Sequence, residues 1–197
     1  GYGFLAENAN CARRCEEEGI RFVGPSAETL ELFGDKVKAR ALAERAGVPV
    51  LPGTSSPVTL DAAREFFQSV GEGRGIMLKA VAGGGGRGAR AVLSLDELDE
   101  AFARCQSEAQ AAFGNGDLYA ELLIPRARHI EVQVVGDGTG TVSHLWEREC
   151  SIQRRYQKVV EIAPSAGLPG GLRQRILTAA VRMAEAANYD NIGTFEF

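Results

Sequence analysis

The stretch from 79 to 90, KAVAGGGGRGAR, constrains the fold more than any other part of the sequence. An apolar run, Ile76 to Leu78, precedes it, and a second, Ala89 to Leu93, lies at its end. Two short apolar runs around a glycine-rich segment predict an antiparallel hairpin whose tip has almost no side chains. Glycine adopts positive φ without penalty and lets backbone N–H groups approach an anion closely. We therefore expect this hairpin to cover a polyphosphate, with Lys79 and Arg87 as cations at the two ends of its loop.

A flexible surface loop is the plain alternative, because glycine runs by themselves are low-complexity sequence. The stretch is not a P-loop, since no Gly-Lys-Ser/Thr follows at the required spacing. It is not a dinucleotide fingerprint either, since Ala91 to Leu93 predicts a strand where that motif needs a helix. A glycine flap between two antiparallel strands is the phosphate-covering design that remains.

Composition excludes several classes of protein. The chain has 197 residues, 45% apolar and 24% charged, which is enough for one medium domain or two small ones. Its net charge of −4 argues against nucleic acid as a partner. No apolar run reaches transmembrane length and no signal peptide precedes the first residue, so we expect no membrane association and a cytoplasmic location, or a mitochondrial one in a eukaryote. The chain starts in the middle of a motif and is expected to be a fragment.

The four cysteines lack the spacing of a metal site, so free thiols in a reducing compartment are expected. Cys11 and Cys15 are one helical turn apart and fit a buried helix face. Basic residues cluster at 126–129 and 148–158 within an acidic chain. This clustering indicates a specific small anion rather than a long polyanion.

Hydrophobic spacing and capping signals predict the secondary structure. Helices are expected at about 8–19, 27–33, 36–46, 59–70, 95–113 and 171–187, and strands at 21–23, 76–78, 89–93, 118–121, 129–135, 141–147 and 193–197. Asp35 is the expected N-cap of the third helix, and Ser94 with Glu97 forms an expected capping box. The segment 147–158 is too dense in polar groups for a core strand. Glu196 lies in an alternating strand, which leaves open whether it faces solvent or a metal ion.

Several motifs together resemble the biotin carboxylase component of biotin-dependent carboxylases, an ATP-grasp enzyme. They are GYGFLAEN at 1–8, GDK at 34–36, the glycine loop, RHIEVQ at 128–133, ERECSIQRRYQKVVE at 147–161 and GTFEF at 193–197. The match runs from end to end in order and spacing. The variant ERECSIQRRYQKVVEIAPS is closer to the pyruvate carboxylase type than to the bacterial acetyl-CoA carboxylase subunit.

The resemblance implies an α+β / α/β fold, specifically a fragment of an ATP-grasp fold. Its expected parts are the end of an N-terminal domain at 1–23, a helical linker at 24–50, the lid with the glycine flap at 51–123, and the start of the C-terminal catalytic domain at 124–197. Further catalytic residues of the family would lie after Phe197. The 197 residues alone are therefore expected to bind nucleotide poorly and to catalyse nothing.

The implied activity is that of a ligase that forms a C–N bond. MgATP activates bicarbonate as carboxyphosphate, which gives up CO₂ to biotin on a carrier protein. The expected cofactors are ATP, Mg²⁺ or Mn²⁺, and biotin as the substrate. The expected partners are a biotin carboxyl carrier, a carboxyltransferase and a second copy of the chain. The final acceptor stays open among acetyl-CoA, propionyl-CoA, pyruvate and urea.

The same resemblance implies the site residues. The expected nucleotide ligands are Lys36, Lys79, Gly83, Gly84, Gly85, Gly86, Arg87, Gly88, Glu121, Ile124, His129 and Gln153. Among them the two lysines would contact phosphates, the glycines would close over them, and Glu121 with the backbone near Ile124 would bind the adenine edge. The expected catalytic residues are Lys158, which would stabilise bicarbonate or carboxyphosphate, and Arg155. Glu196 is an expected ligand of Mg²⁺ or Mn²⁺.

Two departures from the family pattern are visible. Tyr156 stands where the family often has histidine, and Ala82 stands where the glycine run often starts. Three alternatives stay open: another ATP-grasp ligase such as a carbamoyl-phosphate synthetase half or a purine-pathway ligase, a non-catalytic binding or assembly module, and a nucleic-acid protein that uses 148–158. The acidic total disfavours the last of these.

Overall fold

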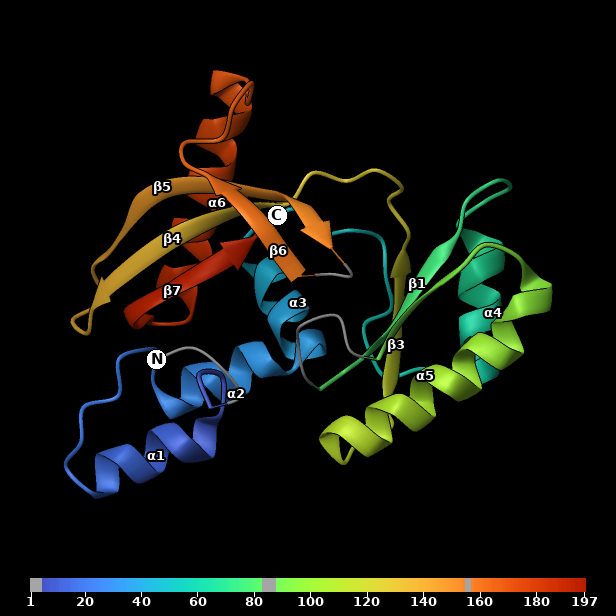
Figure 1. Cartoon of the computed structure of the whole chain (residues 1–197), viewed down its shortest axis with the longest axis horizontal. Coiled ribbons are helices and arrows are strands. Elements are labelled where there is room, and N and C mark those ends of the chain that lie inside the picture. Colours follow the sequence, from blue (N-terminus) through green and yellow to red (C-terminus); the bar gives the residue numbers. More distant parts are fainter. Residues whose placement is uncertain (1–4, 83–87, 155–156) are drawn as a thin grey trace. The chain divides into compact units, whose positions relative to one another are not determined.

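The computed structural model describes residues 5–82, 88–154 and 157–197 (Figure 1). The chain divides into two compact units, each described here by itself. The first unit comprises Gly1–Phe33, Leu42–Val48 and Ala127–Phe197, and the second comprises Gly34–Ala41 and Pro49–Arg126. These compact units and the domains that the resemblance implies are different divisions of the chain, and the domain boundaries stay a prediction.

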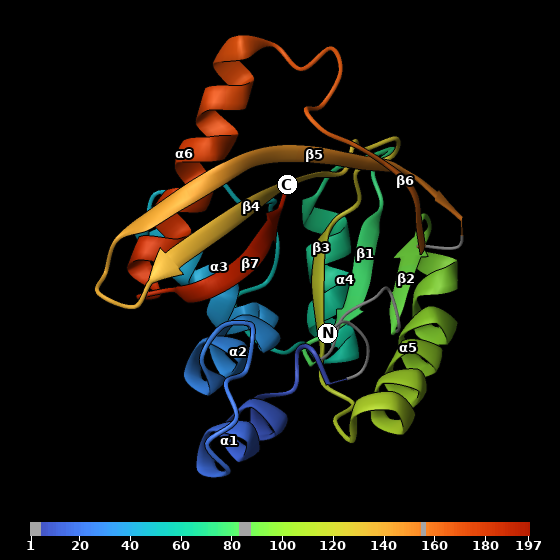
Figure 2. The ribbon, with the colours of Figure 1, turned by 60° about the vertical axis from the view of Figure 1, so that its left-hand side comes forward.

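The second unit is built on a three-stranded antiparallel sheet in the order β2-β1-β3. The strands are β1 (Ile76–Ala80), β2 (Ala89–Val92) and β3 (Leu118–Leu122). The apolar residues of β1 alternate inward, and α4 (Leu60–Ser69) and α5 (Leu98–Phe113) pack against that face (Figure 2). The predicted hairpin around the glycine stretch is therefore confirmed in its two strands.

Helix starts in the second unit follow the capping rules in two cases out of three. Asp35 Oδ1 accepts hydrogen bonds from the backbone N–H groups of Val37 and Lys38 at 3.0 and 3.1 Å, at the start of α3 (Lys36–Arg45). Thr59 Oγ1 accepts from the N–H of Ala62 at 3.2 Å and caps α4.

The expected capping box at Ser94 is wrong. A 3-10 turn, η1 (Leu95–Glu97), precedes α5, and the Ser94 side chain makes no capping hydrogen bond. Glu97 Oε2 instead accepts from the N–H of Leu93 at 3.4 Å. The extra turn moves the first turn of the α-helix beyond the reach of the Ser94 hydroxyl.

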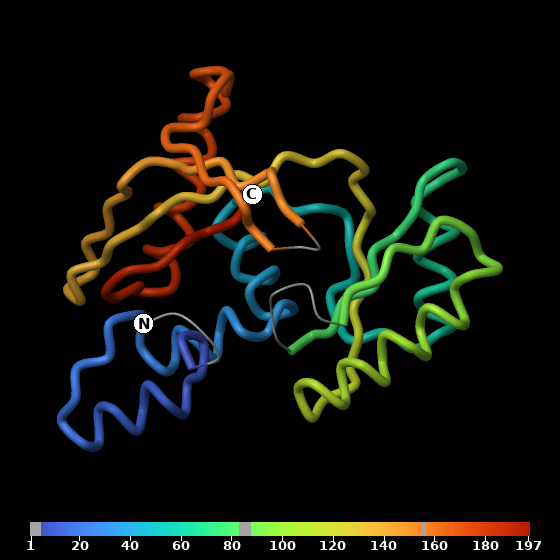
Figure 3. Tube along the Cα trace, in the orientation of Figure 1, coloured from blue at the N-terminus to red at the C-terminus, as the bar shows by residue number. Residues whose placement is uncertain are grey.

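The first unit contains a four-stranded antiparallel sheet in the order β6-β5-β4-β7. The strands are β4 (Ile130–Asp137), β5 (Val142–Arg154), β6 (Gln157–Ile162) and β7 (Asp190–Glu196). Helix α6 (Gly170–Ala186) packs on the face that carries the apolar residues of β4. The tube trace shows the helix running beside this sheet (Figure 3).

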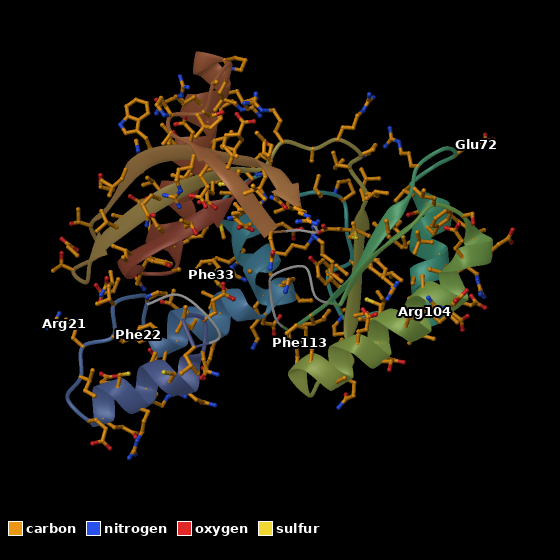
Figure 4. All side chains as sticks on the ribbon, viewed as in Figure 1. Arg21, Phe22, Phe33, Glu72, Arg104 and Phe113 are labelled. Carbon is orange, nitrogen blue, oxygen red and sulfur yellow. The ribbon has the colours of Figure 1, made fainter. Side chains whose placement is uncertain are left out.

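The core of the first unit also includes residues from its N-terminal part. That part contains α1 (Ala9–Glu17) and α2 (Ala27–Gly34). Phe33, labelled in Figure 4, packs edge-on against Phe195 with ring centroids 5.2 Å apart and lies 6.1 Å from the ring of Tyr189. Within the described residues every helix is too short or too polar to span a bilayer.

Three local expectations in the first unit need correction. Residues 21–23 form no strand and Val23 is 63% exposed, because no described strand pairs with this three-residue run. Cys11 and Cys15 are half-buried, and the buried residue of α1 is Ala12. The polar segment forms strand where none was expected, since β5 runs to Arg154 and β6 begins at Gln157, although β6 is exposed throughout and is not a core strand, as predicted. All four cysteines are free, as expected.

Candidate functional site

In the second unit, two neighbouring strands bring together a group that we call the Lys79 cluster: Lys79, Tyr119 and Glu121. Lys79 lies on β1 opposite Tyr119 on β3, and Glu121 is two residues further along the same face of β3. Lys79 Nζ donates to Glu121 Oε1, and the Tyr119 hydroxyl donates to Glu121 Oε2 at 3.3 Å. The predicted phosphate lysine and the predicted adenine carboxylate are thus paired with each other.

Lys36, the other predicted phosphate lysine, begins α3 in the same unit. Its backbone N–H donates to Val81 O at 3.3 Å, and Asp35 forms an isolated bridge with Ala82. These contacts fix the start of α3 beside the chain that leaves β1, two residues beyond Lys79.

The glycine flap can be examined at one residue, because Gly83, Gly84, Gly85, Gly86 and Arg87 lie outside the described residues. Gly88 has a φ of +64°, and a Cβ there would lie 3.1 Å from Ala80 Cβ. Its carbonyl accepts from Ala80 N at 2.8 Å and from the Cys105 thiol at 3.0 Å. Glycine is therefore required here by the packing of the hairpin, and its contact with phosphate stays a prediction. Ile124 is exposed just after β3.

In the first unit, the polar face of the sheet carries a second group, the Lys158 cluster: Lys158, Glu131, Glu196, Arg148 and His129. Lys158 Nζ donates to Glu131 Oε2, and to Glu196 Oε1 at 2.9 Å. Arg148 donates to Glu131 Oε1 through Nε at 2.7 Å and approaches it through Nη2 at 2.5 Å. The Glu131 side chain is only 4% exposed. One buried carboxylate thus joins two cations.

Hydrogen bonding fixes the charges of this cluster. Burial lowers the pKa of Lys158, but its hydrogen bonds to Glu131 and Glu196 outweigh burial and the net pKa is raised. Burial raises the pKa of Glu131, and its hydrogen bonds from Lys158 and Arg148 bring the net pKa below the ordinary value. Lys158 is therefore a permanent cation at neutral pH. It can stabilise an anion but cannot serve as a general base.

Two other predicted residues of the first unit, His129 and Gln153, are among the described residues. His129 Nε2 is buried without a hydrogen-bond partner, although it lies 3.2 Å from Glu196 Oε1. Gln153 Nε2 donates to the Cys150 carbonyl at 2.9 Å. Arg155, predicted to be catalytic, lies outside the described residues, as does Tyr156.

The Lys158 cluster can be tested for a divalent cation. Ligand atoms of His129, Glu131 and Glu196 all lie within 4.8 Å of one another. Glu196 is 57% exposed and offers the carboxylate oxygen that Mg²⁺ and Mn²⁺ prefer, so it fits the predicted role. Glu131 fits poorly, because Arg148 and Lys158 already occupy both of its oxygens. A cation at Glu196 Oε1 would compete with the Lys158 ammonium for that atom.

Three residues of these clusters were not predicted: Glu131, Arg148 and Tyr119. The signal for Glu131 was present, since the alternation of RHIEVQ places it on the polar face with His129. Arg148 pairs in register with Glu131 across β4 and β5, which one strand alone does not reveal. Tyr119 is two residues before Glu121, and period-two spacing places both on one face.

A separate ionic network anchors the segment between β6 and α6. Arg128 donates to both oxygens of Glu149, at 2.9 and 2.6 Å, and also to Ser165 Oγ. The buried Glu147 accepts from Ser165 N at 3.1 Å and from Arg173 Nε at 2.8 Å. These bonds tie the sheet to the first turn of α6 and explain why Glu147 within the polar segment tolerates burial.

Comparison with known proteins identifies the family. Residues 35–197 match the family described as "Carbamoyl-phosphate synthase L chain, ATP binding domain", and residues 1–30 match "Biotin carboxylase, N-terminal domain". The chain is 57% identical to the pyruvate carboxylase of Bacillus subtilis (strain 168) over 198 residues. It is 54% identical to the mitochondrial pyruvate carboxylase of Homo sapiens. All of the chain is covered in both cases, but it spans 17% of the length of each relative.

Solved structures give the same result. A biotin carboxylase from Campylobacter jejuni, described as a complex with β,γ-ATP, matches with a TM-score of 0.94 at 45% identity, over 100% of this chain and 44% of that one. The biotin carboxylase domain dimer of the Hydrogenobacter thermophilus 2-oxoglutarate carboxylase, described with MgADP, ADP and bicarbonate, matches with a TM-score of 0.93 at 46% identity. That match covers 100% of this chain and 43% of that one. The chain therefore belongs to the biotin carboxylase domains of biotin-dependent carboxylases, within the ATP-grasp family.

Proposed function

We propose that the chain carries the nucleotide- and bicarbonate-binding residues of a biotin carboxylase, which uses ATP and bicarbonate to carboxylate biotin on a carrier. One observation carries the proposal: the Lys158 ammonium is held between Glu131 and Glu196 on the polar face of a sheet. Carboxyphosphate chemistry needs a fixed cation for an anionic reactant and a carboxylate for a divalent metal, and this cluster contains both.

The chain's own groups would act by positioning and charge. In the second unit, Lys36 and Lys79 would hold ATP phosphates, and Glu121 would accept a hydrogen bond from the adenine amino group. In the first unit, Lys158 would bind bicarbonate and stabilise the charge that develops as a bicarbonate oxygen attacks the terminal phosphorus of ATP and ADP leaves. Glu196 would hold Mg²⁺ or Mn²⁺, which supplies charge neutralisation on the phosphates when bound. His129 and Gln153 would contact the nucleotide, and Arg155 would assist Lys158.

Partners and location extend the proposal to the whole protein. Its partners would be a biotin carboxyl carrier, a carboxyltransferase and a second copy, in keeping with the dimer named for the 2-oxoglutarate carboxylase structure. The proposed location is the cytoplasm, or the mitochondrion in a eukaryote. The human relative is named as a mitochondrial enzyme. The identities to pyruvate carboxylases favour pyruvate as the final acceptor.

A chimera tests the function. The 197 residues replace the matching segment of the Bacillus subtilis pyruvate carboxylase, and bicarbonate-dependent ATP hydrolysis is measured with and without free biotin. We expect biotin to stimulate hydrolysis, and Lys158→Ala to abolish the stimulation while Lys38→Ala, an exposed lysine on α3, leaves it unchanged. Hydrolysis that ignores biotin but depends on ammonia would contradict the proposal and favour a carbamoyl-phosphate synthetase-like reaction.

A further inference from the structure

Glu121 makes more contacts within the protein than it would need if its only role were to bind a ligand. Lys79 contacts one of its oxygens and Tyr119 the other. The side chain of Glu121 is 14% exposed, and Tyr119 is 5% exposed. Because a carboxylate has about four acceptor positions, the two donors leave about two free, in directions that the donors determine.

The backbone around Glu121 is fixed as well. Gly53 forms an isolated bridge with Glu121, and a Cβ at Gly53 would lie 3.2 Å from Glu121 Cβ and 3.0 Å from Ala120 O. The bare backbone of Gly53 therefore lies directly against the base of the Glu121 side chain. A carboxylate fixed at both its root and its oxygens has little freedom to rotate.

Tyr119 is not explained by the hydrophobic core. Its neighbours Leu118 and Ala120 point into the core with α4 and α5, whereas Tyr119 alternates to the opposite face with Glu121. Burying a phenol hydroxyl without a hydrogen bond is costly, and Glu121 Oε2 is the acceptor found among the described residues. Burial and the neighbouring Glu121 raise the pKa of Tyr119, against the opposing charge of Arg40, so the hydroxyl stays a donor.

We propose that Tyr119 is a positioning residue that sets the direction of the Glu121 carboxylate and thereby the preference of the nucleotide site for a 6-amino purine over a 6-oxo purine. This inference rests on the proposed function, which gives Glu121 the adenine edge. A 6-amino group donates to a free acceptor position of Glu121. A 6-oxo group is itself an acceptor. Its oxygen and the oxygen of Glu121 would then face each other with no hydrogen between them.

The test compares ATP with ITP, which differ at the 6-position of the base. In the Bacillus subtilis chimera, kcat/KM for bicarbonate-dependent hydrolysis is measured for both nucleotides. Tyr119→Phe should reduce the ATP-over-ITP preference about tenfold, the loss expected for one hydrogen bond to a charged group. Tyr189→Phe, the same change at a tyrosine in the core of the first unit, should leave the preference unchanged.

A double-mutant cycle distinguishes a positioning role of Tyr119 from a general loss of structure caused by its substitution. If Tyr119 acts through Glu121, then Glu121→Gln should remove the preference and adding Tyr119→Phe to it should change nothing further. Unfolding temperatures of the 197-residue chain with and without Tyr119→Phe record any effect on stability. A preference that survives Tyr119→Phe but disappears in Glu121→Gln would overturn the role of Tyr119. A chimera that hydrolyses neither nucleotide would instead contradict the proposed function, and this inference would fall with it.

Discussion

The Lys79 cluster and the Lys158 cluster use the same local design and differ in how many opposite charges surround the lysine. In each, the lysine extends from a strand of an antiparallel sheet and contacts a carboxylate on another strand of that sheet. Lys79 on β1 contacts Glu121 on the neighbouring β3, and Lys158 on β6 contacts Glu131 on β4, one strand beyond β5. Lys158 contacts Glu131 and Glu196, and Glu131 is shared with Arg148. Lys79 contacts Glu121, whose other oxygen is bonded to a neutral phenol.

This difference indicates what each cluster can do when a ligand arrives. If a metal ion takes Glu196, Lys158 still has Glu131, which is buried and joined to a second cation. Among the described residues, Lys79 has no second carboxylate partner. We therefore expect the Lys158 cluster to keep its geometry through binding. In the Lys79 cluster we expect Lys79 to turn to phosphate while Tyr119 keeps Glu121 in place.

The largest expected effect comes from removing the buried carboxylate. Glu131→Gln leaves Lys158 and Arg148 without their shared counter-charge and should lower the free energy of unfolding by about 3–5 kcal/mol. Glu121→Gln, at a single and more exposed pair, should cost about 1 kcal/mol. Urea unfolding of the 197-residue chain measures both. Equal losses for the two variants would contradict the distinction between the clusters.

A smaller effect tests how tightly Glu121 is held. Gly53→Ala brings a methyl group within 3.0 Å of Ala120 O and Arg40 Nη1, so the strand or the arginine must shift, at a cost of about 1–3 kcal/mol. The matched control is Gly171→Ala in α6, where a Cβ meets nothing within 4 Å. That control should be neutral or slightly stabilising. Thermal unfolding compares them, and a neutral Gly53→Ala would show that this part of the second unit is loosely packed.

The smallest effect concerns acid sensitivity in the first unit. Hydrogen bonds from Arg128 and Ser165 lower the pKa of Glu149 to about 2. Because the folded pKa lies below that of the unfolded chain, this group contributes stability above about pH 4.5, and the contribution is lost as pH falls toward 2.

Glu149→Gln should therefore flatten the fall in stability across that range, and Arg128→Met should do the same. Arg182→Met, an exposed arginine on α6, serves as control and should leave the slope unchanged. Urea midpoints measured at several pH values between 2 and 5 provide the comparison. An unaltered slope in both Glu149→Gln and Arg128→Met would show that this ion pair does not tune acid stability.

The elements that could be predicted from the sequence are those whose signals are local. The paired strands around the glycine stretch, the Asp35 cap and the α6 helix follow from apolar spacing and capping chemistry. The strand expected at 21–23 does not form, because a run of three residues does not determine which strand it would pair with.

The site residues that sequence reasoning missed depend on pairing between strands. Arg148 faces Glu131 only because β4 and β5 pair in a register that shifts at a bulge between Val132 and Val134. Lys158 reaches Glu131 only because β6 lies next to β5. Such contacts are set by the turn and the bulge, which a single strand's alternation does not encode.

The most direct test separates the two lysines in the Bacillus subtilis chimera. Lys79→Met and Lys158→Met are compared through KM for ATP, KM for bicarbonate and kcat of biotin-stimulated hydrolysis. We predict that Lys79→Met raises KM for ATP at least about tenfold with little change in KM for bicarbonate. Lys158→Met should lower kcat about 100-fold, or raise KM for bicarbonate, while KM for ATP is kept. Two variants that damage ATP binding equally and leave the bicarbonate dependence intact would contradict the assignment of Lys158 to bicarbonate.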